Sequence, residues 1–188
     1  MNRRKWLQGL FAAAAGGGLV AGEAGAAAGA PPRDVEALQK NWRMLLAEGA
    51  PAPSATDKVK LANDEWRKRL ERTSYNVLRE EGTERAGTSP LNNEKRAGIY
   101  ACAGCDLPLF TSDMKFDSGT GWPSFFTTIP GVFETKTDRL LMYARTEYHC
   151  TRCGGHHGHI FDDGPRPTGL RYCNNGVALK FIPRSAKA

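Results

Sequence analysis

Apolar residues between positions 31 and 53 recur at three- and four-residue intervals, the spacing of one helical face. The residues that form this face are Val35, Leu38, Trp42, Leu45 and Leu46. Asp34 is suited to cap the first turn, and Gly49 ends the pattern ahead of two prolines. We therefore predict a helix over residues 34–48 and a Pro/Ala/Ser linker over residues 50–56.

Two shorter helices are predicted next, one starting at Asn63 or Asp64 and one over residues 74–81. From residue 87 the helical period fades and short strand-like runs appear between Gly, Pro and Asp residues. These runs are residues 98–101, 107–110, 132–135, 140–148, 159–161, 170–173 and 177–182. The pattern predicts a mainly β (α+β) fold, with antiparallel sheets or a small barrel and the helices N-terminal to it.

The first 30 residues have the pattern of an export signal. Arg3, Arg4 and Lys5 precede an Ala/Gly-rich apolar stretch, and small residues at positions 28–30 resemble a cleavage site. The paired arginines indicate the twin-arginine (Tat) route and a periplasmic location. An uncleaved membrane anchor is the alternative, but the stretch is short of the about 20 apolar residues that span a bilayer.

The net charge and its distribution along the chain do not indicate a polyanionic partner. The 188-residue chain has a formal charge of +6, and residues 1–30 hold three positive charges and one negative, so +4 remains after cleavage. Basic residues are interspersed with acidic ones, whereas nucleic-acid binders gather them on one face. We expect no nucleic-acid partner, no membrane anchor after cleavage, and a monomer.

The five cysteines divide into four plus one. Cys102 with Cys105 and Cys150 with Cys153 form two C-x-x-C pairs beside glycines, the spacing of a tetrahedral structural zinc site. The alternatives are two disulfides, or one disulfide and a redox-active pair, because the periplasm is oxidising. With four thiolates on zinc, no coordination position stays open to activate water.

Cys173 is then a free thiol. An inert buried thiol is the plain interpretation, but Arg171 and Asn175 each lie two residues away. A guanidinium lowers the pKa of a thiol, and the thiolate is the attacking form. One short strand would thus present a nucleophile, a positive charge and an amide.

Two loops accompany this strand. One holds three histidines in four residues, of which we favour His156 and His159 for acid–base chemistry over a surface loop or a second metal. His149 adjoins a predicted zinc ligand and is expected to be structural. The other loop, residues 118–126, reads SGTGWPSFF, and its Trp122 is either part of the core or a pocket wall offered to a methyl group.

Together these motifs resemble the methionine-R-sulfoxide reductases of the B type, over about residues 62–181. The segments that carry the likeness read CAGCDLPLF (102–110), SGTGWPSF (118–125), GGHHGHIF (154–161) and GPRPTGLRYC (164–173), followed by Asn175. The resemblance implies one reductase domain over residues 62–182, preceded by a helix and linker over residues 31–61 and followed by a basic tail over residues 183–188.

The resemblance also implies roles for single residues. Zinc would be held by the four cysteines of the two pairs, and Cys173 would be the catalytic nucleophile. The residues matching the family's other active-site positions are His156, His159 and Asn175, with Trp122, Arg171 and Phe161 as substrate-binding residues. The substrate would be methionine-R-sulfoxide in oxidised proteins, whose repair is stereospecific.

Three positions depart from the family pattern. Thr120 stands where many members have a resolving cysteine, which predicts a one-cysteine cycle completed by a thioredoxin-like protein or a small thiol. His157 replaces an apolar residue and could alter local pKa values or attract a metal. Asn174 and Gly176 flank Asn175 in place of the usual residues and would loosen the strand.

Two other functions compete with this interpretation. A zinc-ribbon binding module would explain the four paired cysteines but leaves Cys173, His156 and His159 without a purpose. A thiol–disulfide oxidoreductase that uses a C-x-x-C directly would hold no stoichiometric zinc.

Overall fold

The computed structural model describes residues 34–46, 50–139 and 144–184. All of them belong to the second of the chain's two units, Pro32–Ala188. The predicted export signal, the last residues of the predicted first helix, the start of the predicted strand at 140–148 and residues 185–188 of the tail lie outside the described residues.

The N-terminal helices are short. Helix α1 (Val35–Lys40) begins where expected, since the Asp34 carboxylate accepts a hydrogen bond from the N–H of Ala37 at 3.0 Å, a cap that contributes about 1 kcal/mol. The α-helix ends at Lys40, earlier than predicted, and the chain continues as the 3-10 helix η1 (Trp42–Leu45).

Helices α2 (Asn63–Arg69) and α3 (Arg72–Glu80) confirm the two shorter helical predictions. Glu81 ends α3 in the left-handed region, with φ of 56°, and the N–H of Gly82 returns to the carbonyl of Asn76 at 3.0 Å. This C-terminal turn leads the chain into the loop that carries Glu84.

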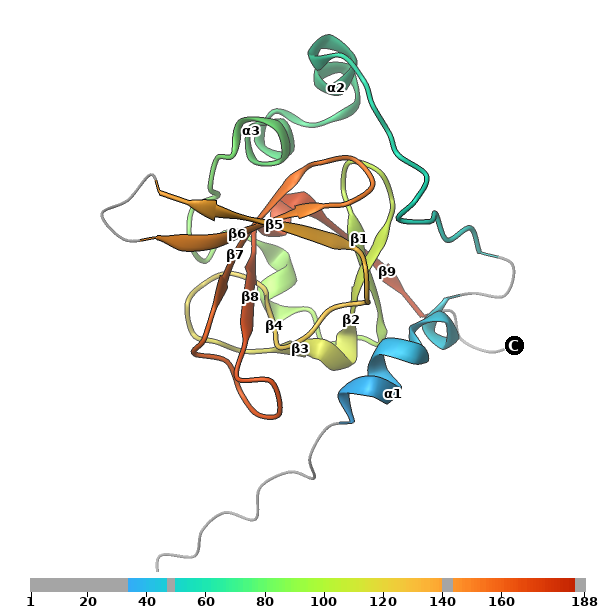
Figure 1. The fold of residues 1–188 in the computed structure, drawn as a ribbon, viewed down its shortest axis with the longest axis vertical. Helices are drawn as coiled ribbons and strands as arrows, with labels where there is room; N and C mark the ends of the chain where they lie inside the picture. Colours follow the sequence, from blue (N-terminus) through green and yellow to red (C-terminus); the bar gives the residue numbers. More distant parts are fainter. Residues whose placement is uncertain (1–33, 47–49, 140–143, 185–188) are drawn as a thin grey trace, which may run out of the picture. The chain divides into compact units, whose positions relative to one another are not determined.

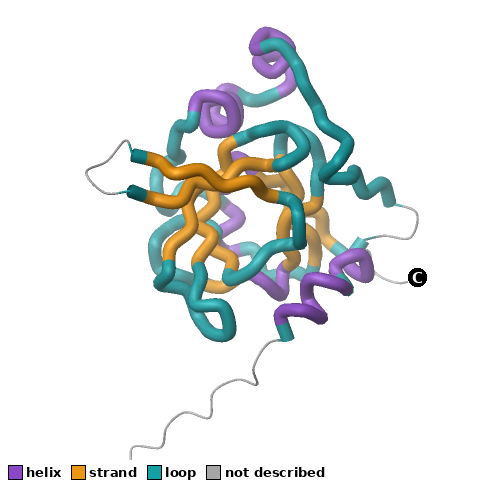
Figure 2. Tube along the Cα trace, in the orientation of Figure 1, coloured by secondary structure: helices purple, strands orange, loops and turns teal. Residues whose placement is uncertain are grey.

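Two antiparallel sheets form the rest of the unit (Figures 1 and 2). The three-stranded sheet has the order β2-β1-β9, formed by Pro108–Thr111, Gly98–Cys102 and Leu179–Pro183. The six-stranded sheet has the order β3-β4-β8-β7-β6-β5. Its strands are β3 (Lys115–Phe116), β4 (Ser124–Phe125), β5 (Phe133–Asp138), β6 (Arg145–Cys150), β7 (His156–Phe161) and β8 (Arg171–Asn174).

The predicted antiparallel fold is confirmed, with differences at the strand ends. Strands β3 and β4 were not expected, because two residues each are too few to show a period. Strand β7 starts at His156 rather than at residue 159. The three remaining 3-10 turns are η2 (Pro90–Asn93), η3 (Ser112–Met114) and η4 (Gly176–Ala178).

Aromatic side chains join the two sheets. The ring of Phe110 in β2 stacks on Phe125 in β4, with centroids 3.9 Å apart, and Tyr100 in β1 meets Phe125 edge-on at 5.0 Å. All three are fully buried. Helix α3 packs against β7 and η4 through the buried Val77 and Leu78.

Among the described residues, every helix is too short or too polar to cross a membrane.

Candidate active site and metal centre

The four paired cysteines converge in the core. Their Sγ atoms all lie within 4.8 Å of one another, with Cys102 and Cys153 separated by 3.7 Å and Cys105 and Cys150 by 3.6 Å. All four are buried free thiols. A tetrahedron of sulfurs about 2.3 Å from a central Zn²⁺ has edges of about 3.8 Å, so the donor set and its spacing fit a metal ion. The disulfides considered as the alternative are not formed.

Each of the two cysteine pairs is followed by a turn of the same type. After the second cysteine of each pair the chain enters the left-handed region, at Asp106 (φ 62°) and at Gly154 (φ 70°). Their N–H groups return to the carbonyls of Cys102 and Cys150 at 2.9 and 2.8 Å. Because Cys102 ends β1 and Cys150 ends β6, a metal ion here would tie the two sheets together.

Cys173 lies outside this cluster, on β8, and opens on a separate pocket of about 190 Å³. Five predicted site residues line the pocket, namely Cys173, His159, Asn175, Trp122 and Phe161. Thr83, Arg145, Gly158 and Asn174 complete its wall. The fold thus brings together residues that are up to 92 positions apart, as in Thr83 and Asn175.

The surroundings of the Cys173 thiol act in opposite directions. Burial raises its pKa, while the nearby Arg171 guanidinium and a hydrogen bond from Thr120 lower it. Arg171 does not line the pocket; its guanidinium lies 4.3 Å from the centre of the Phe161 ring and forms two bonds to Asp163, at 2.7 and 2.9 Å. These contacts hold the positive charge on the side of β8 that carries the thiol.

His159 lies beside the thiol on the neighbouring strand, because it pairs with Cys173 in the register of β7 and β8. Its Nε2 lies 2.9 Å from Oδ2 of Asp138, and Arg145 donates to the same oxygen at 2.5 Å. The carboxylate fixes the ring and leaves Nδ1 as the nitrogen for other contacts.

The other two histidines of this segment lie away from the pocket. His156 does not line the pocket; its ring lies behind His159 with centroids 5.6 Å apart and is 1% exposed. Burial lowers its pKa to about 3, so it is neutral near pH 7. His157 turns to the other side of the sheet and is fully buried against Tyr148 and Phe133.

A bulge explains this arrangement. In a regular strand His156 and His159 would point to opposite faces. The register shifts between Tyr148 and His149, so that β6 advances two residues from Glu147 to His149 while β7 advances three, from His159 to His156. The extra residue returns His156 to the face that carries His159, where the two rings meet edge-on.

Asn175 and Trp122 are positioned by one loop residue that the sequence did not single out. The N–H of Glu84 donates to Oδ1 of Asn175 at 2.9 Å, and its carbonyl accepts the indole N–H of Trp122 at 3.1 Å. The Nδ2 of Asn175 also donates to the carbonyl of His157 at 3.0 Å, which leaves its second N–H for a ligand. The Glu84 carboxylate bonds the N–H groups of Gly176 and Val177 at 2.5 and 3.1 Å.

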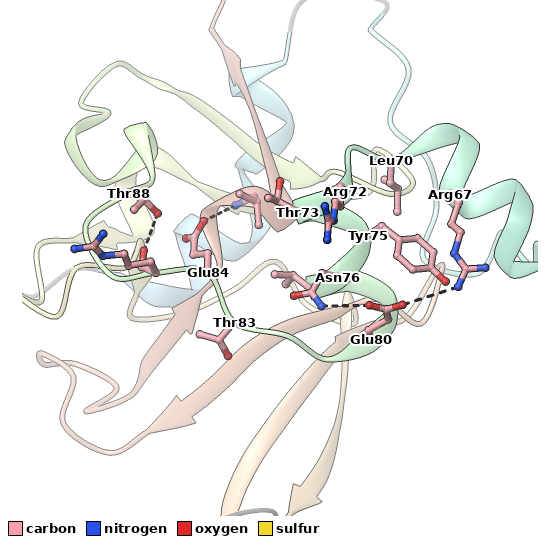
Figure 3. Close-up of a pocket in the computed structure, with 13 residues that line it drawn as sticks. Arg67, Leu70, Arg72, Thr73, Tyr75, Asn76, Glu80, Thr83, Glu84 and Thr88 are labelled. Carbon is pink, nitrogen blue, oxygen red and sulfur yellow. Dashed lines mark hydrogen bonds and ion pairs between the residues drawn. The ribbon is translucent and has the colours of Figure 1, made fainter.

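A larger groove borders this site (Figure 3). It has a volume of about 1020 Å³ and is lined by α2, α3 and the loop that follows. Thr83 lines both the groove and the Cys173 pocket, so the two cavities adjoin.

Sequence reasoning missed Glu84, Asp138, Arg145 and Glu147. They belong to no short motif, and their neighbours in space come from other strands. The single available signal was the alternation of polar residues along residues 145–149, which places Arg145, Glu147 and His149 on one face of a strand.

The fold and site define a class: an antiparallel β protein with a four-cysteine metal centre and a separate thiol in a small pocket. A family model described as the SelR domain matches residues 70–183. The peptide methionine sulfoxide reductase MsrB of Agrobacterium fabrum (strain C58) is 50% identical over 127 residues, 67% of this chain and 94% of that protein.

Two further relatives agree. The MsrB protein of Pseudomonas putida (strain W619) is 52% identical over 129 residues, 68% of this chain and 96% of that protein. The chloroplastic peptide methionine sulfoxide reductase B1 of Oryza sativa subsp. japonica is 52% identical over 122 residues, although the chain spans only 57% of its length. The chain belongs to the SelR family of MsrB peptide methionine sulfoxide reductases, as the sequence motifs predicted.

Proposed function

We propose that this protein reduces methionine-R-sulfoxide in peptides and proteins to methionine, with Cys173 as the nucleophile. The observation that carries the proposal is the position of Cys173: the one cysteine outside the metal cluster opens on a pocket that also presents His159 and Trp122. The names of the MsrB relatives support the same activity.

The chemistry is a two-electron transfer between sulfur atoms. The Cys173 thiolate attacks the sulfoxide sulfur, the sulfur–oxygen bond of the substrate breaks, and the oxygen takes one proton and becomes bonded to the Cys173 sulfur. Methionine leaves, and Cys173 becomes a sulfenic acid. The substrate sulfur is reduced by two electrons and the cysteine sulfur is oxidised by two.

Each neighbouring residue has a task in this step. His159 delivers the proton, because it faces Cys173 and its other nitrogen is held by Asp138. Asn175 holds the departing oxygen through its free amide N–H. Trp122 and Phe161 contact the methyl group and select the R epimer by shape. His156, neutral and behind His159, acts as a positioning residue.

An external thiol completes the cycle. Thr120 stands beside Cys173, and the other four cysteines lie together as a set of ligands for a metal ion, which supports a cycle without a resolving cysteine. A thioredoxin-like protein or a small thiol attacks the sulfenic acid, releases water and forms a mixed disulfide. A second thiol then releases Cys173 in its reduced form and leaves with the first as a disulfide.

The metal at the four cysteines is Zn²⁺ in this proposal. Zn²⁺ favours four thiolates in a closed tetrahedral site, and such a site supplies structural stability rather than water activation. The ion would hold the ends of β1 and β6 and thereby the histidine-bearing strand that follows Cys153.

The test uses both sulfoxide epimers of a blocked methionine with dithiothreitol as reductant. Wild-type protein is expected to consume the R epimer alone. Cys173→Ser removes this activity and keeps the fold and the metal content of the wild type. Full turnover by Cys173→Ser, or equal use of both epimers, would contradict the proposal.

We also propose that residues 1–30 are a signal that directs export of the protein through the twin-arginine route. The expected mature N-terminus lies near residue 31, in the periplasm. N-terminal sequencing of fractionated protein tests this, with an Arg3→Lys, Arg4→Lys double variant expected to remain in the cytoplasm. An intact N-terminus in the periplasm would contradict cleavage.

A further inference from the structure

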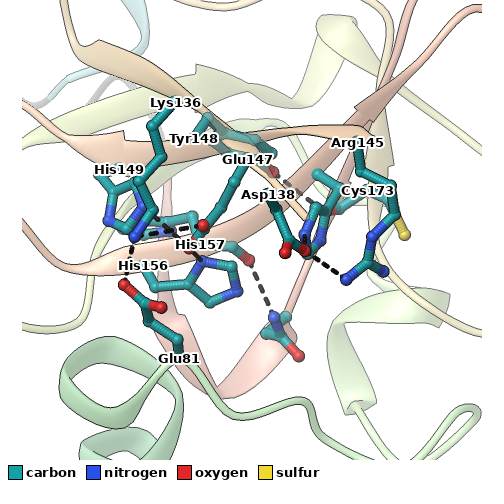
Figure 4. Close-up of polar contacts among 12 residues, drawn as sticks. Glu81, Lys136, Asp138, Arg145, Glu147, Tyr148, His149, His156, His157 and Cys173 are labelled. Atoms are coloured by element: carbon teal, nitrogen blue, oxygen red, sulfur yellow. Dashed lines mark hydrogen bonds and ion pairs between the residues drawn. The ribbon is translucent and has the colours of Figure 1, made fainter. Parts of the chain in front are cut away.

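Donor atoms of three buried side chains meet on the β6–β7 face of the six-stranded sheet (Figure 4). Oε1 of Glu147 lies 2.8 Å from Nε2 of His149 and 2.5 Å from Nδ1 of His156. The three ligand atoms lie within 4.8 Å of one another. The side chains are 4%, 15% and 2% exposed, respectively.

These short distances are not hydrogen bonds. Among the described residues, Oε1 of Glu147, Nε2 of His149 and both ring nitrogens of His156 have no hydrogen-bond partner of acceptable geometry. Buried polar atoms are nearly always paired in native proteins. The three side chains therefore present buried donor atoms that lack hydrogen-bond partners and are available as ligands for a cation.

The backbone fixes the arrangement. Glu147 and His149 are two residues apart on β6 and so share a face, and His149 pairs directly with His156 on β7. The bulge at this point turns His156 to that face. The cluster therefore does not depend on flexible loops.

We propose that Glu147, His149 and His156 form a second metal site, separate from the four-cysteine centre. Two imidazoles and one carboxylate suit a borderline divalent cation such as Zn²⁺, Co²⁺ or Ni²⁺, and not Ca²⁺ or Mg²⁺, which take oxygen ligands. With three protein ligands, one coordination position stays open to water or another ligand.

The charges next to the cluster influence its affinity for a cation. Lys136 lies 3.3 Å from Oε2 of Glu147 and also pairs with Glu81 at 2.5 Å. Its positive charge opposes a bound cation and neutralises the carboxylate when none is bound. A cation in the cluster would lie one imidazole away from His159, since His156 is the shared neighbour.

The experiment is a Co²⁺ titration of the full chain already loaded with Zn²⁺ at the four cysteines. Wild-type protein is expected to bind one further equivalent, with visible d–d bands but without the intense near-ultraviolet sulfur-to-metal bands of thiolate ligation. His149→Ala and Glu147→Gln should weaken this binding more than tenfold. Glu134→Gln, a matched exposed carboxylate opposite His149 on β5, should bind as the wild type does.

Lys136→Met is expected to strengthen Co²⁺ binding, because it removes the competing charge. The proposal is overturned if wild-type protein binds no further Co²⁺, or if His149→Ala binds it as tightly as the wild type. The readout is metal binding and not turnover, so its failure would leave the proposed reductase activity untouched.

Discussion

The backbone N–H of Glu84 donates a hydrogen bond to the side-chain carbonyl of Asn175, at 2.9 Å. Through this contact a residue 91 positions earlier in the chain fixes the amide of the proposed oxyanion-binding residue. The Glu84 carboxylate then caps the next two N–H groups, at Gly176 and Val177.

Replacement of Glu84 should therefore lower the rate of catalysis, and more so as more of its acceptor oxygens are removed. Glu84→Gln keeps one acceptor oxygen for two N–H groups, and Glu84→Ala keeps none. A lost charge-assisted hydrogen bond costs about 1.5–3 kcal/mol, so we expect kcat/KM to fall about tenfold in Glu84→Gln and further in Glu84→Ala. Glu80→Ala, a half-exposed carboxylate in the adjoining groove, is the control and should match the wild type. Equal rates in all three variants would contradict the positioning role.

Replacing Thr120 with cysteine should change the way in which oxidised Cys173 is reduced, from attack by an external thiol to formation of an internal disulfide. Thr120 already contacts the Cys173 sulfur through its hydroxyl. After a single turnover without reductant, Thr120→Cys is expected to form an internal disulfide, seen as a loss of two hydrogens by mass spectrometry. Thr120→Ser and wild-type protein should instead retain a sulfenic acid that reacts with a dimedone-type trap. An internal disulfide of Cys173 in wild-type protein would refute the one-cysteine cycle.

The pH dependence of thiol reactivity should report the charge of Arg171. Burial raises the pKa of Cys173, and the guanidinium of Arg171 partly offsets it. Without that charge the pKa rises further, so the alkylation rate of Arg171→Leu should begin to climb at a higher pH than in the wild type. Iodoacetamide alkylation over pH 6–10 measures this. Arg69→Leu, an exposed cation on α2, should leave the profile unchanged, and an unshifted profile in Arg171→Leu would remove the electrostatic role.

His157→Leu should stabilise the protein, most of all in acid. The His157 ring is fully buried; Asn174 lies beside it, but neither ring nitrogen has a hydrogen bond of acceptable geometry within the described residues. Leucine removes this buried polar cost, worth about 1–3 kcal/mol.

The sign of the pH effect follows from the pKa of His157, which burial lowers from 6.5 to about 3. Between these values the unfolded chain binds the proton and the folded chain does not, so stability falls as the pH drops below about 6.5. The gain from His157→Leu should therefore be on the order of 2 kcal/mol larger at pH 5 than at pH 7.5. Urea unfolding at both pH values measures it, with His157→Gln as a control that loses the titration but keeps a buried polar group. A gain that does not depend on pH would contradict a neutral, buried imidazole.

Loss of the four-cysteine centre should destabilise the whole unit. Cys102→Ser removes one ligand at the end of β1 and leaves a buried hydroxyl in its place. Metal binding at such sites contributes directly to folding free energy, and a loss of about 3 kcal/mol would lower Tm by about 10 °C. Calorimetry with metal analysis tests this, and an unchanged Tm in the metal-free variant would show that the centre is not structural.

Local sequence determined much of this protein. The two C-x-x-C pairs and the lone Cys173 fix a metal centre and a separate thiol, because both depend on spacing within short segments. The start of α1 follows from Asp34, whose cap is made within one turn. The strands with a clear period-two pattern were likewise predictable.

Tertiary structure decided what depends on partners from other strands. The bulge opposite Tyr148 and His149 sends His156 and His159 to one face and His157 into the core, although the three are near neighbours in sequence. Glu84, Asp138 and Glu147 acquire their roles only when β5, β6, β7 and the loop after α3 come together. A side chain's face is set by the register of its strand, and register is a property of the pair of strands rather than of either sequence alone.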